Sequence, residues 1–155
     1  MMGVSTNGIV AFGVALEEGV TLPWESDPDF DDDIETWWFS VNKYEGRLSP
    51  FTDLGEYAPG FSRGDPRIDQ YFEDRRNWLK GNPLPIQLQN YCSDSCPMWA
   101  ACVPDTIVTA FRGYPEALDF EAMGTPDATK LVEFLEKHEI EYEGQPGWLL
   151  MSYWG

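Results

Sequence analysis

The sequence predicts a single α+β domain spanning residues 1–155, in which a mostly antiparallel sheet of about five strands packs with about three helices. A chain of 155 residues is the size of one domain. Its hydrophobic content of 43%, with seven Trp, seven Tyr and nine Phe, indicates a packed core rather than a disordered chain. Segments with strand patterns are grouped along the chain, which favours α+β over α/β.

The first predicted strand covers residues 7–16, NGIVAFGVAL, where apolar residues occupy both alternating faces. Such a strand requires cover on both sides. A helix is predicted over 31–44, because apolar residues recur there at i, i+3, i+4 and i+7: Ile34, Trp37, Trp38 and Val41. Its first turn would be Asp31–Asp33, whose carboxylates face the positive end of the helix dipole.

The middle of the chain predicts a loop and a second helix. Residues 46–66 hold four glycines and three prolines, which is typical of a loop. The helix is predicted over 65–82, with Asp65 as its N-cap, Pro66 in its first position and Gly81 at its end. One face of this helix carries an apolar stripe: Ile68, Tyr71, Phe72 and Leu79.

The second half predicts four more strands and a third helix. The helix covers 125–140, with Thr125 as its cap and Pro126 in its first position. The last predicted strand, 147–155, is apolar on both faces. The strands are predicted at 83–92, 97–103, 106–114 and 147–155, with Pro104-Asp105 turning between the second and third of these.

The composition indicates the cellular compartment and excludes some classes of binding partner. No run approaches the ~20 apolar residues of a membrane span, and we expect no secretion signal. Three cysteines favour reduced thiols in a cytosol over a disulfide framework. The net charge of −17 makes free nucleic acid and anionic membranes poor partners. Residues 1–42 hold nine acids and no Lys or Arg, and residues 113–155 hold nine acids and two bases.

Several short motifs resemble a group of small, uncharacterised acidic proteins encoded by tailed bacteriophages: MGVST (2–6), NPLP (82–85), NYCS (90–93), RGYP (112–115) and PGWLLMSYWG (146–155). The resemblance runs along most of the chain and carries no catalytic residues with it. It implies a phage gene expressed in the cytoplasm of an infected bacterial host. By analogy it favours a host-directed accessory protein, since small acidic phage proteins often inhibit restriction or CRISPR machinery.

Metal and cofactor sites find little support, and we predict none. Alternating aspartates from Asp27 to Asp33 suggest calcium, but the sixth position of such a loop is Asp32 instead of Gly, and the twelfth is Trp38 instead of Glu. A zinc site would need three irregularly spaced cysteines and the single histidine: Cys92, Cys96, Cys102 and His138. Phosphate-binding loop motifs are absent from the sequence.

Two other functions compete with a binding role for the acids. Cys96 lies in a polar turn, and His138 could act as its base in a cysteine-dependent enzyme. Alternatively, arginines around the second helix could bind a signalling nucleotide, using Arg63, Arg67, Arg75 or Arg76. The simpler interpretation of these arginines is a solvated helix face paired with acids, and a structural phage protein is a further alternative.

The acidic N-terminal region carries the main functional hypothesis. Residues 17–35 provide nine acids in nineteen positions without a base, and closely spaced carboxylates can imitate the phosphates of a nucleic acid. We therefore predict a non-enzymatic inhibitor that binds the basic, nucleic-acid-binding surface of a host protein complex. The predicted partner-binding residues are Glu25, Asp27, Asp29, Asp31, Asp32, Asp33 and Glu35.

The expected oligomeric state depends on what covers the apolar strand faces and on the net charge. The apolar faces of 7–16 and 147–154 could be closed by the loop at 46–66 or by a second subunit. A charge of −17 on each subunit opposes self-association. We therefore expect a monomer, with the loop covering some of Trp148, Leu150, Trp154, Val10 and Phe12.

Overall fold

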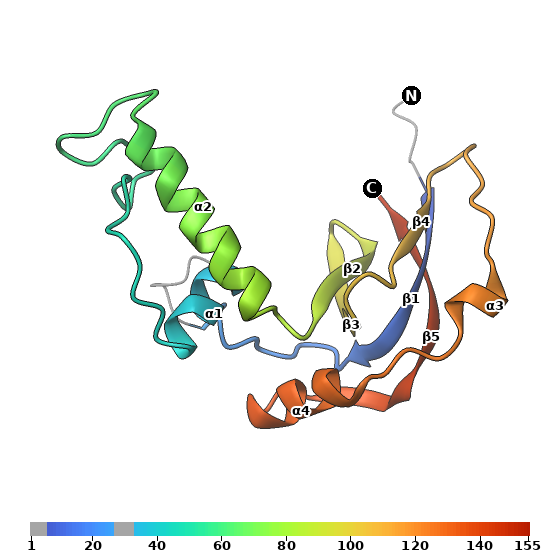
Figure 1. Ribbon diagram of the computed structural model, residues 1–155. Helices are drawn as coiled ribbons and strands as arrows, with labels where there is room; N and C mark the ends of the chain where they lie inside the picture. Colours follow the sequence, from blue (N-terminus) through green and yellow to red (C-terminus); the bar gives the residue numbers. More distant parts are fainter. Residues whose placement is uncertain (1–5, 27–32) are drawn as a thin grey trace.

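A computed structural model of the chain describes residues 6–26 and 33–155, and it confirms the predicted α+β class (Figure 1). Its centre is strand β1 (Thr6–Leu16), which pairs along its length with antiparallel β5 (Tyr142–Trp154). The opposite edge of β1 is shared between two shorter antiparallel strands. The first half of β1 pairs with β4 (Val108–Ala110), and its second half pairs with β3 (Cys96–Cys102).

Four of the strands close into a ring. Strand β2 (Gln87–Ser93) forms a hairpin with β3, and its last two residues pair in parallel with the end of β5. Because β3 also pairs with β1, the ring runs β1–β3–β2–β5 and returns to β1. The sheet is therefore mixed, although β2–β5 is the one parallel pairing among the described strands.

The two faces of β1 lie in two hydrophobic cores, as its sequence predicts. Apolar side chains from the strands of the ring pack together in one of them: Ile9, Ala11, Ala100, Cys102 and Met151. The larger core lies between the sheet and two helices, α1 (Ile34–Val41) and α4 (Thr129–Lys137). There Val14 and Leu16 meet Trp37 and Leu131, so β1 is covered on both sides.

Helix α1 is shorter than the predicted 31–44. Asp33 is its N-cap, and the helix ends at Val41 because Lys43 has a φ of 53°, outside the helical region. The Asn42 side chain closes this end by donating a hydrogen bond to the Trp38 carbonyl oxygen at 2.8 Å. Asp31 and Asp32 lie outside the described residues, so their predicted helical positions stay untested.

Helix α2 (Pro66–Gly81) begins as predicted, with the Asp65 carboxylate accepting from the Arg67 amide at 2.9 Å and Pro66 in the first position. The predicted apolar stripe, however, does not enter a core, since no residue of α2 is buried. The helix lies beside the 43–61 segment and away from the sheet (Figure 1). It is attached to α1 through Trp78, whose ring lies 4.9 Å from that of Phe39.

Several elements of the second half differ from prediction, and among them β2 begins at Gln87 instead of residue 83 and β5 at Tyr142 instead of residue 147. The strand predicted at 106–114 is only Val108–Ala110, which pairs with residues 8–10 of β1, and β3 pairs with the same edge of β1 from Gly13 onward. The helix predicted at 125–140 begins at Thr129 instead, with the Asp127 carboxylate accepting from the Thr129 amide at 2.9 Å. A short helix, α3 (Phe120–Met123), was not predicted.

The predicted cover of the outer sheet face is wrong. The 46–66 loop packs on α2 instead, with Phe51 and Phe72 rings 6.1 Å apart. The segment before α4 contacts the sheet in its place, where the Trp148 indole nitrogen donates to the Gly124 carbonyl oxygen at 2.8 Å. Beyond this contact, Leu150 and Trp154 remain 83% and 53% exposed.

Candidate acidic interaction surface

The β1–β5 pairing brings the two acidic ends of the chain together. Leu16 is paired with Tyr142, and just beyond this pair the Glu17 amide donates to the Glu141 carbonyl oxygen at 3.3 Å. Glutamates that follow β1 therefore lie beside glutamates that precede β5. This juxtaposition is a consequence of the antiparallel register, in which the end of one strand meets the start of the other.

We define the acidic pole as six exposed glutamates at this end of the sheet: Glu17, Glu18, Glu25, Glu136, Glu139 and Glu141. They line two neighbouring hollows of about 160 and 380 Å³, which share Glu17. The smaller hollow also has an apolar part made by Met98 and Trp99. No Lys, Arg or His among the described residues lines either hollow.

The carboxylates of the acidic pole are not neutralised within the described chain. The two ion pairs found there, Arg47–Asp74 and Arg67–Asp65, lie in another part of the molecule. Two pole residues make polar contacts, since Glu25 accepts from the Leu22 amide at 3.2 Å and Glu136 from the Tyr142 hydroxyl at 3.5 Å. The pole therefore presents unpaired negative charge to solvent, where an approaching cation meets little competition.

The predicted partner-binding residues are only partly placed. Glu25 belongs to the acidic pole, whereas Asp33 and Glu35 are exposed at the start of α1. Four others lie outside the described residues: Asp27, Asp29, Asp31 and Asp32. Sequence reasoning missed Glu136, Glu139 and Glu141, although the acidic composition of 113–155 was the signal that could have found them.

Asp33 also stabilises the start of α1 as its N-cap. Its carboxylate accepts from the Glu35 amide at 3.0 Å and from the Thr36 hydroxyl at 2.6 Å. We expect Asp33→Ala to lower the free energy of unfolding by about 1 kcal/mol through loss of this cap, and Asp33→Asn to lower it by less. Urea unfolding followed by circular dichroism measures both variants. Equal losses in the two variants would show that the cap is not the cause.

Cys96 and His138, the residues proposed for cysteine chemistry, contact different parts of the structure. The His138 ring packs on Trp37 and Phe134, with centroids 4.7 and 4.8 Å away, and burial together with Lys137 lowers its pKa. Cys96 lies instead at the β2–β3 hairpin, where its amide donates to the Ser93 hydroxyl. Burial raises the pKa of the Cys102 thiol to about 11, which keeps it protonated in the core.

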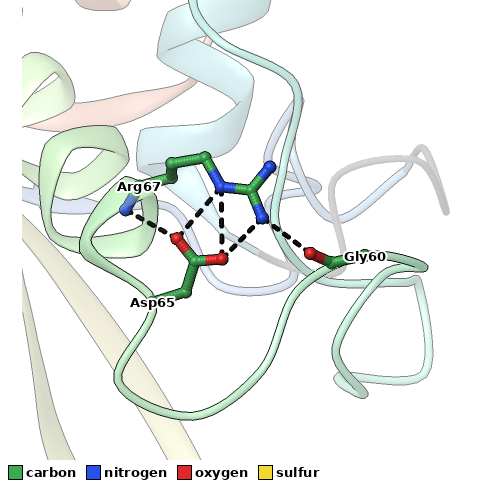
Figure 2. Close-up of polar contacts among 3 residues, drawn as sticks. All are labelled: Gly60, Asp65 and Arg67. Atoms are coloured by element: carbon green, nitrogen blue, oxygen red, sulfur yellow. Dashed lines mark hydrogen bonds and ion pairs between the residues drawn. The ribbon is translucent and has the colours of Figure 1, made fainter.

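The four arginines proposed for nucleotide binding have different environments. Arg67 is held by its own loop, since its guanidinium contacts the Asp65 carboxylate and the Gly60 carbonyl oxygen (Figure 2). The hydrogen bonds from Arg67 lower the pKa of Asp65 to about 2. Arg63 and Arg76 are exposed, whereas Arg75 is half-buried against aromatic rings. The predicted set therefore does not form a single site.

Comparisons with protein-family models, with curated proteins and with solved structures find no match to this chain. The described residues were also searched for membrane-spanning helices and for metal-binding groups. No helix in 6–26 and 33–155 is long and apolar enough to cross a membrane. Within the same ranges, no group of three or more His, Cys, Asp or Glu side chains is arranged to hold a metal ion.

Proposed function

We propose that this protein is a non-enzymatic inhibitor that binds the basic, nucleic-acid-binding surface of a host protein complex through its acidic pole. The observation that supports this proposal is the gathering of six exposed carboxylates, from both ends of the chain, around two adjoining hollows without a lining cation among the described residues. The charge of −17 alone would be explained by solubility. Solubility depends on net charge, however, and does not explain why carboxylates gather at one end of the sheet.

The physical basis is imitation of a phosphate backbone. Double-stranded DNA carries one charge per ~1.7 Å of axis, and a protein channel that binds it is lined with Lys and Arg. A surface with several unneutralised carboxylates is attracted to such a channel and associates with it rapidly at low salt. Met98 and Trp99 beside Glu17 and Glu25 add apolar surface that can receive the aliphatic stem of a lysine or arginine.

The biological setting of the proposal is the cytoplasm of a bacterium infected by a tailed phage. The phage-like motifs of the sequence support this setting, and the reduced cysteines are consistent with it. The target would be a complex that handles nucleic acid or defends the host, of the restriction or CRISPR type. Inhibition would follow because the acidic pole occupies the surface on which the complex binds its nucleic acid.

A capture experiment from bacterial lysate tests this function. We expect the wild-type protein to retain a basic host complex that elutes as salt is raised. Replacing four pole residues by glutamine (Glu17, Glu18, Glu139 and Glu141) is expected to reduce capture at least about tenfold, since opposite charge governs both encounter and specificity. Glu25 and Glu136 are left unchanged because their carboxylates make hydrogen bonds.

The matched control changes the same number of charges elsewhere. Four exposed glutamates outside the pole are replaced by glutamine: Glu56, Glu73, Glu116 and Glu121. Both variants then differ from the wild type by the same net charge, so their solubility is comparable. We expect the control to capture the complex as the wild type does. Equal loss in the two variants, or no loss in either, would contradict a role for the acidic pole.

A further inference from the structure

Another hollow, of about 470 Å³, lies between the end of α1, the 43–49 loop and α2. Three cationic side chains line it, and we call it the basic pocket: Lys43, Arg47 and Arg75, with Phe39, Tyr44 and Ser49. Glu45 is the one carboxylate among the described residues of its lining, and the Asp74 carboxylate contacts Arg47. A local excess of positive charge is unexpected in a chain with 27 acids and 10 bases. The pocket shares no residue with the acidic pole.

Arg75 is held in position and has no anionic partner among the described residues. Its guanidinium carbon lies 3.9 Å from the centre of the Phe39 ring and 5.2 Å from that of Tyr71. The Arg75 side chain makes no hydrogen bond or ion pair within the described chain, although the residue is half-buried. Its guanidinium donors are therefore aimed by stacking and remain available to a ligand.

Of the other two cations, Arg47 is held by its side chain and Lys43 by its backbone alone. Arg47 uses only its Nε to reach the Asp74 carboxylate, at 2.8 Å, which leaves its terminal nitrogens unpaired in the described residues. The backbone of Lys43 is set by the turn that ends α1, where its amide donates to the Ser40 carbonyl oxygen at 3.0 Å. Asp74 and Glu45 offset part of the positive charge, and a bound anion would pair with the terminal nitrogens of Arg47 that Asp74 does not contact. Because Arg47 and Arg75 are already oriented, binding orders few side chains.

The pocket wall is aromatic as well as basic. The rings of Phe39 and Tyr44 lie 4.8 Å apart, and both pack on Trp78, at 4.9 and 5.2 Å. This cluster gives the pocket a firm apolar wall beside its cations. A volume of about 470 Å³ falls within the ~300–1,000 Å³ typical of small-molecule sites. The combination suits an organic anion better than an inorganic one.

We propose that the basic pocket binds a small nucleotide, with its phosphate group held by Lys43, Arg47 and Arg75 and its ring placed against the aromatic wall. Arginine forks match phosphate oxygens, and lysine contributes a third charge. The Ser49 hydroxyl, which lines the pocket, can donate to a further phosphate oxygen. This ligand does not depend on the function proposed for the acidic pole.

The test is an NMR titration of the full-length ¹⁵N-labelled protein with the four ribonucleoside 5′-monophosphates, and with the corresponding nucleosides. We expect saturable shifts of the 43–47 amides and of the Arg75 Nε–H with at least one nucleotide, and none with its nucleoside. Arg75→Gln is expected to weaken binding at least about tenfold, because a charged hydrogen-bond donor is lost. Arg76→Gln, which changes the adjacent exposed arginine, is expected to bind as the wild type does.

A second variant guards against a folding defect in Arg75→Gln, which loses its stacking. Lys43 is exposed, and Lys43→Gln is expected to weaken binding while leaving the remaining spectrum unchanged. The proposal is overturned if no nucleotide causes saturable shifts up to about 10 mM, a concentration that detects even millimolar affinity. It is also overturned if Arg76→Gln weakens binding as much as Arg75→Gln. Shifts caused by a single-stranded oligonucleotide but by no mononucleotide would overturn it too.

Discussion

Replacing Gly13 by alanine is expected to prevent β1 from pairing with β3 and so to open the strand ring. A Cβ at this position would lie 2.1 Å from the Ala101 carbonyl oxygen and 2.7 Å from the Cys102 Cα. Both are backbone atoms of the paired strand, which cannot move aside as a flexible side chain would. We expect a loss of about 3 kcal/mol or more in the free energy of unfolding, at the upper end of what overpacking costs.

The control for this substitution is Gly8→Ala in the same strand. A Cβ at Gly8 would meet no atom within 4 Å, so its effect on stability should be small. Urea unfolding of the two variants measures the difference between them. A Gly13→Ala protein as stable as Gly8→Ala would show that β1 and β3 are not paired as described here.

Replacing Trp37 by alanine is expected to remove the centre of the larger core. Trp37 is 4% exposed, and its ring lies 5.1 Å from that of Trp24 and 5.8 Å from that of Phe134. Truncation of a buried tryptophan costs about 3–5 kcal/mol, because transfer energy is lost and a cavity remains. Trp154→Ala, at a 53% exposed position, is the control and should cost far less. Losses of similar size in the two variants would contradict this core.

The pKa of His138 provides a second measurement on the Trp37→Ala variant. Burial, and then Lys137, lower the pKa of His138 below its ordinary value of 6.5. The folded state therefore favours the neutral ring, and the stability that this ring supports is present above pH 6.5 and declines as the pH falls below it. Trp37→Ala uncovers the ring, so NMR titration should show its pKa rising toward 6.5. An unchanged pKa would mean that Trp37 does not shield His138.

Local signals in the sequence predict the elements that depend on neighbouring residues. Asp65 and Pro66 begin α2 as expected, because a cap and a proline act within one turn. The same signals fail at Thr125, because α4 begins at Thr129 after an Ala128 N-cap. There the Asp127 carboxylate accepts a hydrogen bond from the first helical amide, that of Thr129. Helix boundaries are set by which of several nearby polar residues reaches the free amides, and the sequence offers more than one.

Contacts between distant segments were beyond sequence reasoning. The two apolar faces of β1 predicted that it would be covered on both sides, but not that β3 and β4 would share one edge. The acidic pole illustrates the same limit. The excess of acids at each end of the chain is visible in the sequence, whereas their meeting depends on the pairing of Leu16 with Tyr142. The covering of Trp148 by the segment at Gly124 likewise depends on tertiary structure.

The basic pocket contains one of the four arginines that the sequence analysis grouped together as a nucleotide-binding candidate. Arg75 was one of four arginines considered together because they are close in sequence. The structure separates Arg67, which is bound to Asp65, from Arg75, which is stacked on Phe39. It adds Lys43 and Arg47, which come from the loop after α1 and carry no nucleotide-binding motif. Such a site is assembled by tertiary packing and has no short sequence signature.

If the acidic pole takes the place of a phosphate backbone, this protein and double-stranded DNA must compete for the same surface of the captured partner. The most direct measurement is displacement of the labelled protein from that partner by a DNA duplex, at several salt concentrations. We expect displacement to be complete, and the four-glutamine pole variant to bind with a weaker dependence on salt than the wild type. A stable ternary complex, in which the partner holds DNA and this protein together, would contradict the proposed function.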